Sequence, residues 1–272
     1  MVSKMKFIDL EEMQQIELNM LKEFDKACKE KNLRYYIDGG TLLGAMCYEG
    51  FIPWDDDIDL KMPRPDYEKL GEVISLLPSY MSLAIPTERD CQYTMSKLID
   101  NRTVLIENQN GMKKTTGVYI DILPMDGHPD NNIKHFQKLQ KYNSLFHYSL
   151  NGFRDLKQSS SPLTMAKGYL YNFIYKPWNI YSKLTGTAKR YEYDKCNYVG
   201  LVIEGDYKKE RFERKNLDNC VYLQFESIVV PAPAEYEKHL QQFYGNHINK
   251  KEHYRNLPYI KPHHNYEVYW KE

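Results

Sequence analysis

The sequence predicts an α/β protein of the α+β kind, in which helices flank a mixed sheet and a helical, tyrosine-rich lobe follows. Apolar residues recur at helical spacing over residues 10–31. Polar and apolar residues alternate over 57–61 and 118–122, as they do in strands. From residue 129 to about residue 195 the pattern becomes helical and rich in Tyr, Lys and Asn.

The first helix is predicted over residues 10–31. Asp9 is followed three residues later by Glu12, a capping-box pattern that marks the start of a helix. Methionines and other apolar residues then form one stripe along the segment. Such a stripe is typical of a helix that packs against a core, so we expect a structural role.

A glycine turn is predicted next. Residues 33–37 are aromatic and β-branched, which favours a strand, and residues 42–46 are apolar helix formers. Between them lie Gly39, Gly40 and Thr41. Glycine lets a backbone approach a ligand closely, and the N-terminus of the following helix offers N–H groups to a phosphate. A Gly-Gly pair alone usually marks only a tight turn.

Four acids follow within five residues, in front of Pro63. On a strand over 57–61, alternation places Asp55, Asp57 and Asp59 on one face. Carboxylates at this spacing can share one cation or two, and hard oxygen ligands suit Mg²⁺ or Mn²⁺ better than Zn²⁺. A solvated acidic turn is the alternative interpretation.

A third acid is expected to join them from another strand. After a predicted helix over 66–77 and one or two strands within 91–106, the strand over 118–122 ends at Pro124. Its apolar residues face one side and leave Asp121 on the other. A lone acid on a strand is usually just solvated, but here it can complete a triad.

The rest of the chain is predicted to be mixed. The expected elements are a surface loop over 159–162, strands over 198–203 and 221–225, and a helix over 235–243 that stops at Gly245.

Composition excludes several classes of protein. The net charge is zero and no long basic run occurs, so binding to nucleic acid is not expected. Five cysteines without a Cys-x-x-Cys pair argue against a disulfide framework and a thiolate zinc site. We find neither a signal-peptide pattern nor an apolar run long enough to span a membrane. These observations predict a cytoplasmic protein.

The combination of glycine turn, Asp-x-Asp and a later Asp fits phosphoryl transfer. That reaction needs metal ions on the donor oxygens, a carboxylate that takes a proton, and N–H groups that hold phosphate. Arg64, just after the acids, and Lys97 are candidates to bind the donor phosphates, as is Arg102, although surface charge is the alternative for each. No P-loop or hydrolase motif is present.

The residues that carry this pattern resemble the signature of the LicD family, phosphocholine transferases related to the fukutin proteins. The resemblance is strongest in 38–45 and 50–59 and covers nearly the whole chain. It continues at 62–67, 119–124, 225–226, 244–245 and 264–270.

The resemblance implies a nucleotidyltransferase-like fold and a metal-dependent reaction. Phosphocholine, or a similar alcohol phosphate such as ribitol phosphate, would pass from CDP-choline or a related CDP-alcohol to a hydroxyl, with release of CMP. The acceptor would be a cell-surface glycan or its lipid-linked precursor, as in teichoic acid or lipopolysaccharide synthesis. The inner face of the membrane is an alternative location to the cytoplasm.

The resemblance also assigns residues and regions. Residues 1–127 would form the catalytic core, and 128–272 a helical and mixed part that binds the acceptor and packs on the core as one globular unit. The metal, Mg²⁺ with Mn²⁺ as the alternative, would be held by Asp57 and Asp59 with Asp55 and Asp121, and the donor phosphate by Gly39, Gly40 and Arg64. The residue pattern adds Thr41 and Lys97 to the expected donor-binding set.

Two other hypotheses remain open from the residues. A sugar-nucleotide glycosyltransferase also uses an Asp-x-Asp metal site, but it gives no reason for the glycine turn or for Asp121. A catalytically inactive glycan-binding module is the other, and it would more often have lost the acids that are present here.

Overall fold

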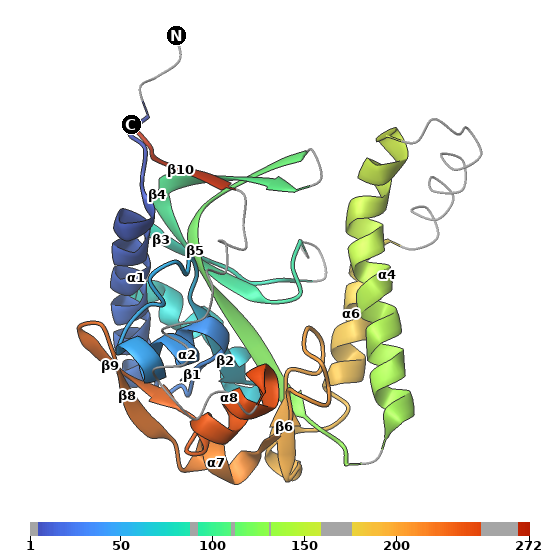
Figure 1. The fold of residues 1–272 in the computed structure, drawn as a ribbon. Helices are drawn as coiled ribbons and strands as arrows, with labels where there is room; N and C mark the ends of the chain where they lie inside the picture. The colour runs from blue at the N-terminus through green and yellow to red at the C-terminus, as the bar shows by residue number, and fades with distance from the viewer. Residues whose placement is uncertain (1–4, 88–91, 110–111, 131, 159–175, 246–265) are drawn as a thin grey trace. The chain divides into compact units, whose positions relative to one another are not determined.

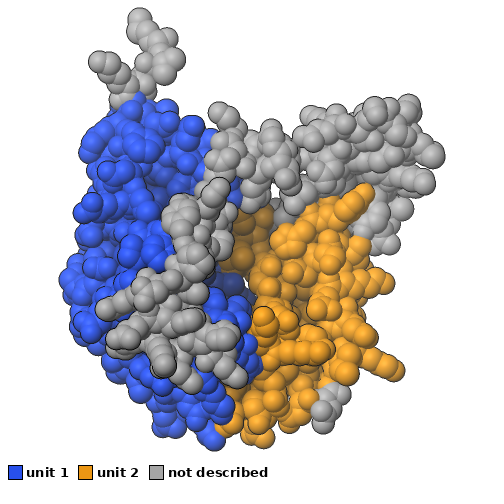
Figure 2. Space-filling model, in the orientation of Figure 1, with its two compact units in different colours: residues 1–85, 96–124, 215–272 blue, residues 86–95, 125–214 orange. Residues whose placement is uncertain are grey.

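The computed structural model describes residues 5–87, 92–109, 112–130, 132–158, 176–245 and 266–272. The chain divides into two compact units (Figure 2), and each is described by itself. Unit 1 comprises residues 1–85, 96–124 and 215–272, and unit 2 comprises 86–95 and 125–214. Helices flank a mixed set of strands (Figure 1), so the predicted α+β class is confirmed.

The two units are not separated by a single point in the sequence. Residues 215–272 cluster with the N-terminal residues in unit 1, while unit 2 is built mainly from 125–214. The division into a catalytic core over 1–127 and an acceptor part over 128–272 stays a prediction, because a compact unit is not by itself a functional domain.

Unit 1 is organised around an antiparallel-rich sheet. Lys97 pairs with Asp121 and Leu98 with Ile120, which fixes the register of two long neighbouring strands. The strands follow the order β1 (Tyr36–Ile37), β2 (Asp59–Pro63), β5 (Met112–Gly127), β4 (Ser96–Gln109) and β10 (Tyr266–Trp270), and β3 (Met81–Ala84) also pairs with β4.

Helix α1 (Leu10–Lys31) confirms the first predicted helix. The Asp9 side chain accepts a hydrogen bond from the Glu12 N–H, as the capping pattern predicts. The apolar stripe is fully buried at Met20 and Phe24, so the helix is held by its packing face. The other helices among the described residues of unit 1 are α2 (Gly39–Tyr48), α3 (Arg64–Tyr67), η1 (Leu70–Leu76), α7 (Arg214–Asp218, which begins at the unit boundary) and α8 (Tyr236–Tyr244).

A separate hairpin completes the core of unit 1. Strands β8 (Val221–Phe225) and β9 (Ile228–Ala232) pair antiparallel. Phe225 and Val230 are fully buried in the same apolar cluster as α1. The hairpin therefore belongs to the core although it lies about 200 residues from α1 in the sequence.

The part of unit 2 that the structure describes contains a helical pair and a small sheet. Its helices pack through a separate cluster that includes the fully buried Leu139, Phe146 and Leu184. The elements are α4 (Ile133–Gln158), α6 (Pro177–Ala188), η2 (Tyr193–Lys195), β6 (Tyr198–Gly200) and β7 (Phe212–Glu213), with the last residues of β5 pairing to β6. Across the described residues of both units, no helix combines the length and apolar character needed to cross a bilayer.

Several predicted boundaries differ from the structure. β2 begins at Asp59 rather than at residue 57, and the chain before it includes a turn in which the Asp55 N–H donates to the Ile52 carbonyl. β5 continues past Pro124, which costs no hydrogen bond to β4 because that pairing ends at Ile122.

Other predictions were wrong in detail. The helix predicted over 66–77 is two short ones, α3 and η1, and the strand predicted over 198–203 ends at Gly200. The surface loop predicted over 159–162 lies outside the described residues.

Candidate active site

The acidic cluster lies in unit 1, between α2 and β2. One carboxylate oxygen each from Asp55, Asp56 and Asp57 lies within 4.8 Å of the others. Alternation on a strand would have turned Asp56 away from its neighbours. Because the strand starts only at Asp59, the turn brings Asp56 into the cluster, where it is buried. Asp56, which the alternation had left out of the expected ligand set, therefore belongs to the cluster.

Asp59 and Asp121 extend the cluster onto the sheet. The Asp121 N–H donates to the Ile58 carbonyl over 3.1 Å, which holds β5 beside β2. The pKa of Asp59 is raised well above its usual range by burial, then by Asp57 and by Asp121. The acids expected to meet in one place thus act on one another electrostatically.

The glycine turn approaches the same acids. Gly39 has φ +55°, and both glycines open α2 rather than preceding it. A Cβ added to Gly40 would stand 2.5 Å from Asp55 Oδ2, closer than any real Cβ contact. The Thr41 hydroxyl accepts a hydrogen bond from the Asp59 N–H at 3.0 Å. Glycine at position 40 therefore lets the start of α2 lie against the Asp55 carboxylate without displacing it.

Lys97 also reaches this group of residues. Its Nζ lies 2.5 Å from Asp121 Oδ1 and 3.4 Å from the centre of the Tyr119 ring. The side chain is only 5% exposed, so the position of the ammonium group is tightly defined. Lys97 is therefore not an exposed surface charge, which was the alternative interpretation of this residue.

The two arginine candidates differ in their surroundings. Arg64 is buried at the start of α3, with its guanidinium 5.2 Å from the centre of the Tyr67 ring. Arg102 forms an ion pair with Asp100 and stacks 3.6 Å over the Tyr80 ring. Arg102 thus has a structural role, while a donor-binding role for Arg64 stays a prediction.

Sequence reasoning missed a buried pair of partners for Asp38, the residue that caps α2. Lys61 Nζ forms an ion pair with one carboxylate oxygen, and His239 Nε2 lies 2.9 Å from the other. Burial raises the pKa of Asp38, but Lys61 and His239 together lower it to below its usual range. Lys61 could have been found, since alternation in β2 places it on the Asp59 side, whereas nothing in the sequence marks His239.

Glu17 was also missed, although it belongs to the packing face of α1. It is fully buried, and both carboxyl oxygens lack a hydrogen-bond partner among the described residues. Burial, followed by Asp57 and Asp56, raises its pKa well above the usual range. One turn earlier, the Gln14 amide donates to the Asp55 carbonyl over 2.8 Å. A buried carboxyl group that holds its proton more tightly than usual thus lies near the acidic turn.

These residues fit a hard divalent cation. All the donor groups in the cluster are carboxylates, which Mg²⁺ and Mn²⁺ prefer. Asp59 has no ion pair among the described residues, and the carboxylates around it disfavour its charged form. A bound cation would reverse that effect and favour ionisation.

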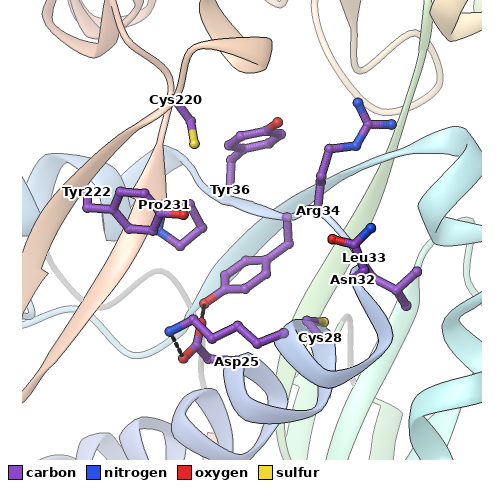
Figure 3. Close-up of a pocket in the computed structure, with 11 residues that line it drawn as sticks. Asp25, Cys28, Asn32, Leu33, Arg34, Tyr36, Cys220, Tyr222 and Pro231 are labelled. Carbon is purple, nitrogen blue, oxygen red and sulfur yellow. Dashed lines mark hydrogen bonds and ion pairs between the residues drawn. The ribbon is translucent and has the colours of Figure 1, made fainter.

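A concave pocket of about 230 Å³ in unit 1 shares no residue with the acids. Figure 3 shows it between the end of α1 and the β8–β9 hairpin. Its acid, Asp25, accepts hydrogen bonds from the Tyr35 hydroxyl at 2.8 Å and from Lys29 Nζ at 2.6 Å. That carboxylate already has a counter-charge and a hydrogen-bond donor from the chain. The pocket therefore lacks the unpaired carboxylates expected of a cation site.

The family match follows the same residues. The family model described as "LicD/FKTN/FKRP, nucleotidyltransferase domain" matches residues 32–158. The chain carries a LicD-family domain. The match includes the glycine turn, the acidic cluster, Lys97 and Asp121, so the resemblance seen in the sequence is confirmed.

Individual relatives extend the LicD match. The chain is 28% identical to a lipopolysaccharide cholinephosphotransferase LicD from Haemophilus influenzae, over 97% of this chain and 99% of the relative. An uncharacterised protein of Rickettsia prowazekii is 26% identical over 41% of this chain and 40% of its own. Mannosyltransferase regulator 4 from Saccharomyces cerevisiae is 31% identical over 38% of this chain but only 9% of its own length.

Proposed function

We propose that the protein transfers phosphocholine, or a similar alcohol phosphate, from a CDP-activated donor to a glycan hydroxyl and releases CMP. The observation that carries the proposal is the meeting of acids from two strands beside a glycine-opened helix, with Gly40 against Asp55. The near full-length similarity to a lipopolysaccharide cholinephosphotransferase supports phosphocholine as the transferred group.

In the proposed reaction the acceptor hydroxyl oxygen attacks the phosphorus that carries choline. A new P–O bond forms, the bond between that phosphorus and CMP breaks, and the hydroxyl proton passes to a carboxylate. Asp57 and Asp59, with Asp55, would hold Mg²⁺ or Mn²⁺, which when bound neutralises charge on the donor phosphates. Asp121 would complete this ligand set or take the proton.

The donor phosphates would be held by the chain's own N–H groups. The start of α2 presents the backbone of Gly39, Gly40 and Thr41, and a helix of ten residues adds a favourable dipole for an anion. Lys97, fixed by Asp121 and by the Tyr119 ring, would place one cation beside the phosphate. Arg64 would add a second.

The acceptor would be a cell-surface glycan or its lipid-linked precursor. Residues 128–272, which include the tyrosine-rich helices, would bind it. We propose a cytoplasmic reaction, with the inner face of the membrane as the site where a lipid-linked acceptor is met.

The test is release of CMP from CDP-choline in the presence of Mg²⁺ and a glycan acceptor. Asp59→Asn is expected to lower the rate roughly 10³-fold, because it weakens the cation site. Glu72→Gln, which changes an exposed acid in η1, serves as the matched control and should not alter the rate. Full activity of Asp59→Asn would refute the assignment.

Parallel reactions separate the rival hypotheses. UDP released from UDP-sugars, without CMP from CDP-choline, would identify a glycosyltransferase. CDP-ribitol in place of CDP-choline tests the transferred alcohol. Removal of divalent ions with EDTA should abolish turnover, and Mg²⁺ or Mn²⁺ should restore it. Glycan binding without turnover of any donor would identify an inactive binding module.

A further inference from the structure

A basic pocket lies in unit 2, where the start of α4 packs beside the end of α6 (Figure 1). Its volume is about 350 Å³. The side chains that matter are Asn132, Lys134, His135 and Lys138 from the α4 side, and Thr187 and Arg190 from the α6 side. None of these belongs to the candidate active site.

The charge in this pocket is one-sided. Lys134, Lys138 and Arg190 line it, and no carboxylate does. Among the described residues none of the three forms an ion pair. The Lys138 Nζ lies 5.6 Å from the centre of the Tyr142 ring, which does not neutralise its charge. In a chain with no net charge, three cations gathered without an acid form a local field that attracts anions.

This arrangement costs helix stability. Lys134 stands in the first turn of α4, where the helix dipole is positive and where no acid is present. Lys138 follows four residues later, so two like charges face each other on the helix surface. Each effect is unfavourable by a few tenths of a kcal/mol. An anion bound in the pocket would remove both costs.

A buried imidazole adds an independent observation. His135 is 5% exposed, and its Nε2 has no hydrogen-bond partner among the described residues. The ring is held edge-on to Phe136 and to Tyr191, at centroid distances of 5.4 and 4.7 Å. Burial lowers the pKa of His135, and Arg190 lowers it further, whereas Asp126 acts in the opposite direction. The positive field of the pocket thus reaches a polar group that lacks a partner.

We propose that this pocket binds a phosphate group. A phosphate carries up to two charges and several acceptor oxygens, which matches two ammonium groups and a guanidinium that can donate two parallel hydrogen bonds. The phosphate can be an ester carried by a sugar or the free inorganic ion. The proposal does not depend on the transferase activity of unit 1.

Calorimetric titration of the full chain with inorganic phosphate tests the site. EDTA is present so that phosphate does not bind through a cation at the acidic cluster. The double variant Lys138→Gln/Arg190→Gln should bind at least about tenfold more weakly, because it removes two charged donors. Lys141→Gln, an exposed lysine of α4 outside the pocket, is the matched control.

Two results would overturn the proposal. One is the absence of binding by the wild-type protein at millimolar phosphate, and the other is equal affinity in the double variant and the wild type. Asp59→Asn should retain phosphate binding, which separates this pocket from the active site. A shift of the His135 ring resonances on addition of phosphate locates the bound ion independently.

A sugar phosphate and inorganic phosphate are then compared on the same variants. Tighter binding of the sugar phosphate, lost in the double variant, supports a site for a phosphorylated glycan. Binding of inorganic phosphate alone, lost in the same variant, supports a site for the free ion.

Discussion

Asp38 and Asp59 are two acids of unit 1 whose backbones are hydrogen-bonded to each other, through the Asp38 N–H and the Asp59 carbonyl. Burial disfavours the charged form of both. Lys61 and His239 nevertheless lower the pKa of Asp38, whereas Asp57 and Asp121 raise the pKa of Asp59. The difference lies in the counter-charge: the chain provides it for Asp38, whereas for Asp59 we propose that a bound cation would provide it.

We therefore propose a structural role for Asp38 and a functional role for Asp59. An acid whose partners come from the chain stabilises the fold, so its loss should be measured in unfolding experiments. An acid surrounded by other acids destabilises the fold, so its removal should not lower stability. If such an acid serves the reaction, its removal should lower the turnover rate instead.

The largest effect on stability is expected for Asp38→Asn. The variant leaves the Lys61 ammonium, only 2% exposed, without a counter-charge, which costs about 3–5 kcal/mol. Asp59→Asn is the matched comparison, because it removes an acid that its neighbours repel. Its free energy of unfolding, measured in urea without divalent ions, should be no more than about 1 kcal/mol below that of the wild type, and it can be higher. A greater loss for Asp59→Asn than for Asp38→Asn would break the comparison.

A smaller effect is expected for Gly40→Ala, now on turnover. The added Cβ would collide with Asp55 Oδ2, and that carboxylate has to move away from the cluster. We expect the rate of CMP release to fall about tenfold or more, because small displacements in a reacting site are costly. Gly71→Ala is the control, since its Cβ would meet nothing within 4 Å. Equal rates for the two variants would argue against a role for the close approach.

The smallest effect is expected for Glu17→Gln, and it depends on pH. In the unfolded chain Glu17 titrates near 4.5, while the folded state keeps its proton to higher pH. Below that pH, Glu17 is protonated in both the folded and the unfolded chain, so its ionisation does not lower stability. Above it the wild type loses up to about 1.4 kcal/mol of stability per pH unit until the folded-state pKa is reached.

Glu17→Gln keeps the shape of the side chain and removes this loss. The variant should therefore match the wild type near about pH 4 and exceed it by at least about 1 kcal/mol near about pH 6.5, without divalent ions. Urea unfolding at both values measures the difference. A constant difference between the two proteins would mean that Glu17 is ionised in the folded state.

Helices and strands could be predicted where the signal lies in neighbouring residues of the sequence. α1 followed from its cap and its apolar period, and β8 from a short β-rich run. β10 was missed as a strand because its partner, β4, lies more than 150 residues away. β9 was missed because its apolar run contains Pro231 and does not alternate.

The candidate site could be predicted where motif and spacing coincide. The glycine turn and Asp55, Asp57 and Asp59 follow from neighbouring residues. Two neighbouring residues come from elsewhere: Glu17 from α1, whose pKa these acids raise, and His239 from α8, which contacts Asp38. Tertiary packing brings those helices to the site, and their spacing in the sequence does not reveal it.

The joining of the two ends of unit 1 has a consequence for biosynthesis. The Ile8 N–H donates to the Val268 carbonyl, and the Trp270 N–H donates to the Lys6 carbonyl, while β10 covers the edge of β4. A ribosome makes residue 8 long before residue 268. The edge of β4 therefore stays open on the nascent chain until β10 has emerged, and a chaperone that shields strand edges would act in that interval.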